Sequence, residues 1–213
     1  MGAEQTDLRA LPEPGRRERK KAATRAALAA AALRLCSERG PEHVTIEQIA
    51  DVADVAPRTF FNYFASKEEA VVAGDGASAI TLVEAFVARP GDEPVIESLR
   101  HALRAVVSEP GYRDRVLRMR TLRGHPTLVA HQLAAFMARE RALAEAIAVR
   151  TGSDPARDLY PALVASATIA GMRVAVQHWL GDHGTDPRDP DLEELVDEVM
   201  ALFDTGLRAV ART

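Results

Sequence analysis

The sequence predicts an all-α protein of about nine to ten helices. Apolar residues recur through most of the chain at the three- and four-residue spacing of an amphipathic helix, without an alternating strand pattern or a hairpin signal. Clusters of glycine and proline interrupt this spacing and mark the helix ends. With 213 residues and 47% apolar content, the chain is long enough for one or two domains with a substantial core.

The chain opens with a tail and a long basic helix. Residues 1–15 contain prolines and a glycine without helical periodicity, so we predict a disordered tail. A helix is predicted over residues 17–39, ended by Gly40 and Pro41. At its start lies the basic arm, residues 16–25, which carries six basic residues against one acidic residue.

Residues 45–69 have the pattern of a helix-turn-helix. Thr45 and Gln48 form a capping box at the start of a short helix, whose apolar residues follow at i, i+3, i+4 and i+7. A tight turn follows, in which we expect Val55 to be buried. A second helix is then predicted over residues 56–64.

This second helix has the features of a recognition helix. Pro57 suits its first turn, Arg58 and Thr59 lie at its front, and Asn62 and Tyr63 lie near its end. A helix-turn-helix presents such residues to the major groove of DNA. We expect three aromatic side chains to anchor the helix: Phe60, Phe61 and Phe64.

The helical pattern continues to the end of the chain. Ser66 and Glu69 form a second capping box, which opens a helix from Lys67 to about residue 74. Further helices are predicted over residues 77–89, 95–108, 112–123, 127–150, 155–180 and 191–211, with Asp154 and Asp191 as candidate caps. We therefore predict a tail (1–15), a three-helix DNA-binding domain (16–74) and a larger helical domain (75–213).

In its N-terminal third the sequence resembles the TetR family of bacterial transcriptional repressors. The run T-x-F-F-x-Y-F-x-S-K-E is more specific than an isolated helix-turn-helix pattern. The matching residues are Thr45, Ile49, Ala50, Val55, Thr59, Phe61, Tyr63, Phe64, Ser66, Lys67 and Glu68. Two positions depart from the family pattern. Asp54 replaces the usual turn glycine, and aspartate is one of the few residues that tolerate a left-handed conformation. Ala56 replaces the usual serine and is a poor N-cap.

The predicted DNA-binding residues fall into three groups. Arg58 and Thr59 are placed to reach base edges. Four residues are expected to hold backbone phosphate, the last of them at a helix N-terminus: Thr45, Asn62, Tyr63 and Lys67. Four come from the basic arm: Arg17, Lys20, Lys21 and Arg25. Such charge runs are also common in solvated tails. The net charge is −4, but phosphate attraction is screened over about 8 Å, so an adjacent arm outweighs distant acidic surface.

The two C-terminal helices are predicted to form a homodimer. Residues 191–211 carry a continuous apolar stripe, and residues 155–180 are apolar on all sides, so both helices must be buried. Filling the core of one subunit is the alternative. We favour a two-fold pair, because one helix-turn-helix rarely suffices, and the resemblance implies the same arrangement. The candidate interface residues are Leu163, Ala167, Ala170, Val174, Leu195, Val199, Phe203 and Leu207.

The resemblance also implies a ligand pocket among residues 77–180. The candidate lining residues are Phe86, Leu103, Val107, Arg115, Arg118, Met119, Leu122, Phe136 and Trp179. For the apolar members, core packing is an equally good explanation. Arg115 and Arg118 beside an apolar cavity would suit an anionic amphipathic ligand, because guanidinium groups pair with carboxylate or phosphate; a solvated helix face is the alternative. The C-terminal half resembles the actinobacterial branch that includes the mycofactocin-system regulator, which implies an acyl-coenzyme A or similar ligand.

The predicted function is ligand-responsive regulation of transcription. We expect a repressor that binds a palindromic double-stranded DNA operator as a homodimer and is released by a small amphipathic effector, with the helix from Lys67 as the lever. The alternatives are a helical small-molecule-binding protein with a degenerate DNA reader, and an unrecognised enzyme. The six histidines lack metal-ligand spacing and no phosphate loop follows a strand, so we predict no catalytic site, metal or cofactor.

The composition favours a cytoplasmic protein. The single cysteine, Cys36, excludes an internal disulfide and falls on an apolar helix face, so we expect a buried, inert thiol. The N-terminus lacks the apolar core of a signal peptide. The longest uncharged stretch, residues 159–172, is short and precedes Arg173, so we expect no membrane span and no membrane partner.

Overall fold

The computed structural model describes residues 15–75, 81–181 and 191–206 of the chain. These residues form ten α-helices and one short 3-10 helix, without a strand, which confirms the predicted all-α fold. In chain order the elements are α1 (Arg16–Arg39), η1 (Pro41–His43), α2 (Ile46–Val52), α3 (Pro57–Phe60), α4 (Lys67–Asp75), α5 (Leu82–Val87), α6 (Val95–Val107), α7 (Tyr112–Leu122), α8 (Pro126–Thr151), α9 (Leu159–Trp179) and α10 (Leu192–Asp204).

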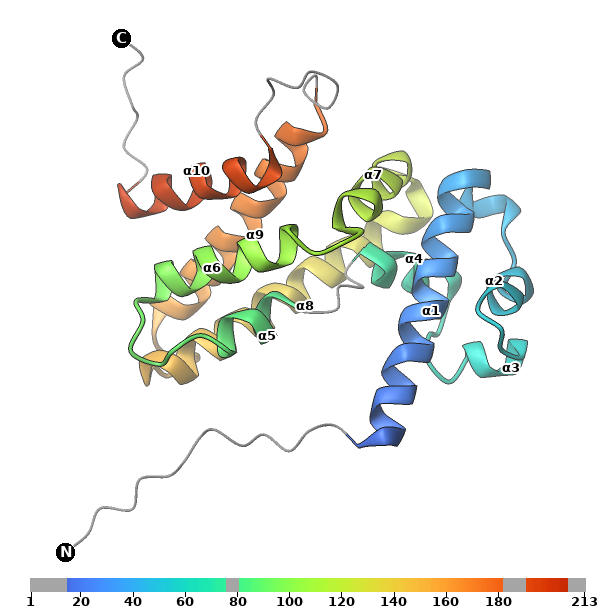
Figure 1. Ribbon diagram of the computed structural model, residues 1–213, viewed down its shortest axis with the longest axis horizontal. Coiled ribbons are helices and arrows are strands. Elements are labelled where there is room, and N and C mark those ends of the chain that lie inside the picture. Colours follow the sequence, from blue (N-terminus) through green and yellow to red (C-terminus); the bar gives the residue numbers. More distant parts are fainter. Residues whose placement is uncertain (1–14, 76–80, 182–190, 207–213) are drawn as a thin grey trace, which may run out of the picture.

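The buried apolar side chains form two cores. The first core lies among α1, α2, α3 and α4, at one end of the molecule (Figure 1). The second core lies among α5, α6, α8, α9 and α10, at the other end. The long helix α8 contributes to both, because Leu128 near its start belongs to the first core and Leu143 to the second. A movement of α8 in the second core can therefore be transmitted along this helix to the first core.

Local capping explains where several helices begin. Thr45 accepts a hydrogen bond from the amide of Gln48 (3.3 Å), and the Gln48 side chain accepts one from the amide of Thr45 (3.0 Å), as predicted. Asp191 and Glu194 form a capping box at the start of α10, which confirms Asp191 as its cap. A capping box that was not predicted, formed by Thr81 with residue 84, starts α5.

The predicted start of α9 was wrong. The helix begins at Leu159 rather than at residue 155, and residues 155–157 form a turn. The Asp154 side chain accepts a hydrogen bond from the amide of Ala156 (2.9 Å), and Asp158 accepts one from the amide of Asp154 (2.8 Å). These bonds satisfy the turn before the helix, so Asp154 stabilises the turn and does not cap α9.

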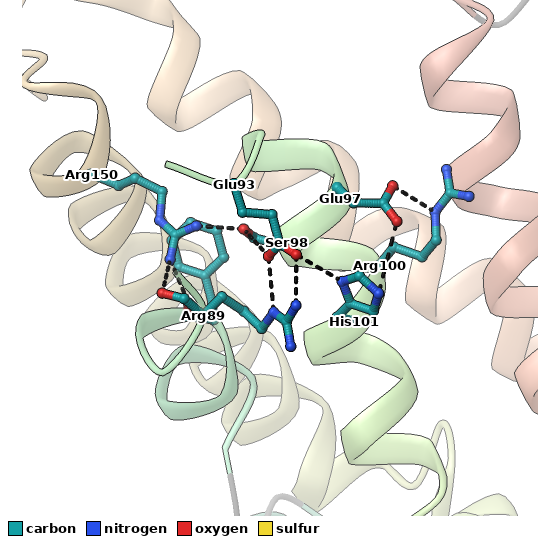
Figure 2. A network of polar contacts seen from close by, with 8 residues as sticks. Arg89, Glu93, Glu97, Ser98, Arg100, His101 and Arg150 are labelled. Carbon is teal, nitrogen blue, oxygen red and sulfur yellow. Dashed lines mark hydrogen bonds and ion pairs between the residues drawn. The ribbon is translucent and has the colours of Figure 1, made fainter. Parts of the chain in front are cut away.

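A polar network fastens the α5–α6 connection to the end of α8 (Figure 2). The guanidinium of Arg150 lies 4.2 Å from the centroid of the Phe86 ring and donates hydrogen bonds to the carbonyl oxygens of Phe86 (2.8 Å) and Arg89 (3.1 Å) and to the Ser98 hydroxyl. Ser98 donates to the Glu93 carboxylate (2.7 Å). Because buried charges need such partners, the network fixes the α5–α6 hairpin on the second core.

Glu93 is the acidic centre of this network. It accepts two hydrogen bonds from Arg89, at 2.9 and 2.6 Å, and its carboxylate lies 3.2 Å from His101 Nδ1 (Figure 2). The hydrogen bonds from Arg89 and Ser98 lower the pKa of Glu93 to about 2. Glu93 therefore stays ionised in the folded protein over most of the acid range.

The single cysteine lies in the first core. Cys36 on α1 has no exposed surface, which confirms the predicted burial. Burial raises the pKa of its thiol to about 11, so the neutral thiol predominates at neutral pH.

Candidate nucleic-acid interface and ligand cavity

The turn between α2 and α3 depends on Asp54. Its φ is 53°, and it is the only non-glycine residue with positive φ in the described part of the chain. The amide of the next residue, Val55, donates to the carbonyl oxygen of Ala50 (3.0 Å), which closes the turn. Val55 itself is only partly buried against the first core. Aspartate thus replaces glycine in the left-handed position, as its short polar side chain allows.

The second helix of the motif is shorter than predicted. Regular helix covers Pro57–Phe60, and residues 61–63 continue as tighter turns in which the amides of Asn62 and Tyr63 bond to carbonyls three residues back (3.1 and 2.9 Å). Ala56 makes no side-chain cap, in line with its poor capping ability. We call residues 57–64 the recognition segment.

Two of the three predicted aromatic anchors are buried. Phe60 and Phe64 are 0% and 2% exposed and hold the recognition segment on the first core. The prediction that Phe61 is an anchor was wrong, because its side chain is 61% exposed. Residues 60 and 64 are four apart and share one helical face, whereas residue 61 is turned about 100° away. The sequence already showed that Phe61 is one position away from the face shared by Phe60 and Phe64. Phe61 is therefore a functional candidate that we missed.

The polar side chains of the recognition segment are accessible. Arg58 and Asn62 are exposed, and Thr59 and Tyr63 are partly buried. Together with Phe61 they form the outer surface of the segment. A helix of this kind offers a guanidinium, an amide and hydroxyl groups to base edges and phosphates.

The basic arm begins α1 and lies near the recognition segment. Arg17, Lys20 and Lys21 are exposed in the first turns of the helix, which extends toward the same side of the molecule as α3 (Figure 1). The guanidinium of Arg25 lies 4.6 Å from the centroid of the Phe64 ring. Arg25 therefore joins the arm to the recognition segment through a cation–π contact.

Lys67 does not have the accessible position that we predicted for a phosphate ligand. Its partly buried ammonium donates to the carbonyl oxygens of Pro41 (2.5 Å) and Val44 (2.9 Å), which lie in and just after η1. These bonds tie the start of α4 to the connection between α1 and α2. The geometry gives Lys67 a structural role, because two of its three donors are already used.

The cap at the start of α4 also differs in part from the prediction. The Ser66 hydroxyl accepts a hydrogen bond from the amide of Glu69 (3.1 Å), as a capping box requires. The Glu69 carboxylate, however, accepts from the amide of Ala65 (2.8 Å) rather than from that of Ser66. The hydrogen bond to the Glu69 carboxylate therefore comes from one residue earlier in the chain than a capping box predicts.

A cavity of about 460 Å³ borders the second core and reaches the end of α4. Its wall is mostly apolar and includes Leu103, Val116, Phe136, Leu143 and Ile169. This volume is within the range of sites for small organic ligands. Of the predicted lining residues, Leu103 and Phe136 lie in the wall.

The other predicted lining residues lie elsewhere. Met119 and Leu122 are buried in the first core, because α7 packs on α1. Phe86 and Val107 are buried in the second core, and Trp179 packs against it. Core packing, the alternative left open by the sequence, accounts for these five residues.

The two predicted pocket arginines also lie outside the cavity wall. Arg115 forms an ion pair with Glu109 (3.0 Å) and stacks on the Tyr112 ring (5.6 Å), whereas Arg118 faces Glu38 of α1 (3.5 Å). The arginines in the wall are instead Arg123, Arg139 and Arg173, which periodicity alone did not single out. Their positions depend on how α7, α8 and α9 pack together.

Polar groups gather where α4 ends at the cavity. Asp75, the last residue of α4, lies in the wall, and its carboxylate is 3.8 Å from the Arg139 guanidinium on α8. Arg139 also stacks on the Phe136 ring at 5.7 Å. Burial raises the pKa of Asp75, and the nearby guanidinium groups of Arg139 and Arg123 oppose that rise. Burial and the Asp75 charge raise the pKa of Tyr112, which lies in the same wall.

Helix α9 presents exposed apolar side chains to the outside. Leu159, Leu163 and Val174 are 75%, 58% and 52% exposed, and Ala167 and Ala170 lie partly buried along the same helix. Their spacing of three, four and seven residues places 163, 167, 170 and 174 on one face. Monomeric proteins rarely expose such stripes, so this face is a candidate interface.

Helix α10 packs inward on its own subunit. Leu195 is buried in the second core, and Val199 and Phe203 pack against it. A Cβ atom at Gly171 of α9 would lie 2.5 Å from Val199 Cγ1 and 2.9 Å from Phe203, so the two helices pack in close contact. These three predicted interface residues thus serve the subunit core, and Leu207 lies outside the described residues.

The expectation that no segment approaches a membrane span was wrong. Among the described residues, α9 alone has the length and apolar composition of such a span, and 33% of its most apolar stretch is buried. The uncharged stretch was counted only to residue 172, whereas the helix continues past Arg173 to Trp179, close to its predicted end. The likeness is one of length and composition only, and α9 also contributes buried side chains to the second core.

Comparison with known proteins bears on both halves of the chain. Residues 28–73 match the family described as bacterial regulatory proteins of the tetR family, and residues 93–208 match the MftR C-terminal domain. The HTH-type transcriptional regulator TcmR of Streptomyces glaucescens is 35% identical over 193 residues, which cover 84% of each chain. A putative mycofactocin biosynthesis transcriptional regulator, MftR of Mycobacterium tuberculosis, is 28% identical over 182 residues, covering 81% of this chain and 87% of MftR.

Solved structures share the fold. A putative TetR-family transcriptional regulator from a Rhodococcus species has a TM-score of 0.58 at 18% identity, covering 86% of this chain and 97% of its own. The FadR repressor of Thermus thermophilus, solved in complex with lauroyl-CoA, has a TM-score of 0.53 at 24% identity, covering 89% of this chain and 98% of its own.

Proposed function

The chain belongs to the TetR family of bacterial transcriptional regulators, and we propose that it is a repressor that binds a palindromic operator as a homodimer and leaves it when an effector fills the cavity. The observation that carries the proposal is the recognition segment. It keeps its apolar anchors buried while Arg58, Phe61 and Asn62 remain exposed on its outer surface.

The proposed DNA contacts follow from exposure and chemistry. Arg58 and Thr59 reach base edges, and Phe61 lies against an apolar surface such as a thymine methyl group. Asn62, Tyr63 and Thr45 bind backbone phosphate, and Arg17, Lys20, Lys21 and Arg25 of the basic arm add charge-based affinity. Lys67 acts indirectly, by fixing the start of α4 on η1.

The proposed dimer uses the exposed face of α9. Pairing of Leu163, Ala167, Ala170 and Val174 with the same residues of a second copy removes their apolar surface from water. α10 lies beside this face, through its close packing on Gly171. A two-fold pair presents two recognition segments to half-sites about 34–36 Å apart, or a multiple of that distance.

The proposed effector is an amphipathic molecule. The apolar wall and its three arginines support a ligand with an apolar body and an acidic group. The FadR relative of similar fold was solved with lauroyl-CoA, which makes an acyl-coenzyme A or a similar long-chain molecule one candidate for this chain. The DNA-binding unit (residues 16–74) and the ligand-binding unit (residues 75–213) would meet where α4 packs on α8.

The test is selection of DNA fragments from a random-sequence pool, followed by anisotropy measurements on the selected fragment. Arg58→Ala should weaken binding by about 1–3 kcal/mol and relax the preference at one base pair. Arg120→Ala, which removes the same charge from an exposed position on α7, is the matched control and should bind normally. If the unmodified protein retained no sequence selectively, the proposal would be abandoned in favour of a ligand-binding protein with a degenerate reader.

A further inference from the structure

Helix α4 joins the recognition half of the protein to the cavity. Its first residue, Lys67, is bonded to carbonyl oxygens beside α2, and its last residue, Asp75, lies in the cavity wall. At a rise of 1.5 Å per residue, the two ends are about 12 Å apart. A movement at Asp75 is therefore carried by one short rigid helix to the connection that precedes the recognition segment.

α4 cannot shift without affecting α1. A Cβ atom at Gly74 would lie 2.6 Å from the carbonyl oxygen of Ala29 and 2.8 Å from Leu33 Cβ. The backbones of α4 and α1 are thus in direct contact one residue before Asp75. Displacement of the end of α4 must move α1, which carries the basic arm, or open this contact.

Asp75 is held in an unfavourable position. It lies at the C-terminal end of a helix, where the helix dipole disfavours a negative charge, and the last turn of α4 has no basic residue to offset it. Its side chain is 26% exposed, and burial raises the pKa of the carboxyl group. The main compensation is the Arg139 guanidinium, so loss of that partner would make the present position of Asp75 costly.

The pairing between Asp75 and Arg139 is open to competition. At 3.8 Å their closest atoms are farther apart than in a charge-assisted hydrogen bond, which is about 2.7–2.9 Å. Arg139 carries five N–H donors in a fork that matches a carboxylate, and it borders the cavity. An acid inside the cavity could therefore form better hydrogen bonds to Arg139 than Asp75 does.

The charges around the cavity also favour an acid. Among the described residues that line it, three are basic, Arg123, Arg139 and Arg173, and Asp75 is the only acidic one. The remaining wall is mainly apolar. A ligand with an apolar body and one acidic group would match both properties, whereas a neutral ligand would leave the excess positive charge uncompensated.

We propose that the cavity takes an apolar molecule with a single acidic group, and that this group binds Arg139 and Arg123 and displaces the Asp75 carboxylate. The displacement moves the end of α4 and lowers the affinity for DNA. This mechanism rests on the proposed function, and it adds the ligand class and the residue pair that couples the two sites. A ligand acts this way because it binds better when Asp75 has moved, with a coupling of about 5–150-fold.

The first experiment measures recognition of the acid. Isothermal titration calorimetry of the full chain compares decanoate with 1-decanol, which have the same chain length and differ in the acidic group. We expect the unmodified protein to bind decanoate about tenfold more tightly than 1-decanol. Arg139→Gln and Arg123→Gln should each reduce this preference, and Arg141→Gln, an exposed arginine two residues further along α8, should retain it.

The second experiment measures the coupling. Asp75→Asn removes the competing carboxylate, so it should bind decanoate about fivefold or more tightly and bind the selected DNA fragment more weakly without any ligand. Asp75→Glu keeps the carboxylate and should restore part of the DNA affinity. Asp92→Asn, the same change at an exposed site outside the cavity wall, is the control. Circular dichroism of each variant identifies any loss of fold.

The outcomes separate this mechanism from the proposed function. Equal binding of decanoate and 1-decanol, or an acid preference that survives both arginine variants, would overturn the ligand class. Unchanged DNA and ligand affinities for Asp75→Asn would overturn the coupling. If the unmodified protein selects no DNA, the proposed function fails, while the calorimetric comparison still decides whether the cavity recognises an acid.

Discussion

The ammonium of Lys67 lies 2.9 Å from the carbonyl oxygen of Val44 and is also hydrogen bonded to the carbonyl oxygen of Pro41. Through these bonds α4 holds the connection between α1 and α2. The recognition segment follows α2 after a turn of a few residues, so its position on the first core depends on this contact. Lys67 therefore links the helix that follows the helix-turn-helix to the segment that precedes it.

Lys67→Met should destabilise the fold without changing the number of phosphate contacts. The variant leaves two carbonyl groups without their charged donor, so we expect a loss of about 1–3 kcal/mol in the free energy of unfolding. The slope of log affinity against log salt should stay the same. Lys21→Met, in the exposed basic arm, should have normal stability and a slope shallower by about 0.9 for each subunit of the bound dimer. Urea unfolding and salt titrations check both, and a shallower slope for Lys67→Met would restore the phosphate role.

Phe61→Ala should affect DNA binding, whereas Phe60→Ala should affect stability. The exposed ring of Phe61 is expected to be buried only on DNA, so its removal should weaken DNA binding by about 1.5–3 kcal/mol with little change in stability. Phe60 is fully buried, and its truncation should cost about 3–5 kcal/mol of stability. Thermal unfolding and anisotropy measurements distinguish the two. A large loss of stability for Phe61→Ala would show that the ring is an anchor after all.

Leu163→Arg should separate the proposed dimer. Placing an uncompensated charge in the middle of the apolar face of α9 is expected to cost about 3 kcal/mol, which raises the dissociation constant of the dimer about a hundredfold. Sedimentation equilibrium measures this constant directly. Val149→Arg, at a residue of α8 that is 85% exposed, should leave the association state unchanged. An intact dimer in Leu163→Arg would exclude this face.

Glu93→Gln should reduce stability in a pH-dependent way. The pKa of Glu93 is lowered in the folded protein from its ordinary value of 4.5 to about 2, so the ionised form favours folding. This contribution is fully present above about pH 4.5 and is lost as the pH falls toward 2. The melting temperature of Glu93→Gln should therefore lie below that of the unmodified protein at pH 6 and approach it near pH 2. A difference that is constant over this range would contradict the assignment.

Local patterns predicted the parts of the structure that are themselves local. The capping box of Thr45 and the cap at Asp191 each involve residues within a few positions of one another, and both are present. At Asp54 the sequence left open whether the turn would be left-handed, and the structure shows that it is. The helices and the helix-turn-helix followed from periodicity and from the TetR resemblance. Their ends were less accurate, as residues 61–63 show, because tight turns and regular helix differ little in sequence.

The cavity and the role of Lys67 could not be predicted in the same way. Met119 and Arg118 share α7 with Val116, and only the packing of α7 against α1 decides which of them borders the cavity. Lys67 meets carbonyl groups more than twenty residues away in the chain. Such contacts depend on how helices cross, which helical periodicity does not specify.

The buried thiol of Cys36 makes this protein convenient for distance measurements. A cysteine introduced at an exposed site, such as Ala65→Cys beside the recognition segment, would be the only readily alkylated position at neutral pH, because Cys36 is enclosed and protonated. Spin labels attached there in both copies of a dimer would report the distance between the two recognition segments by double electron–electron resonance, with and without decanoate.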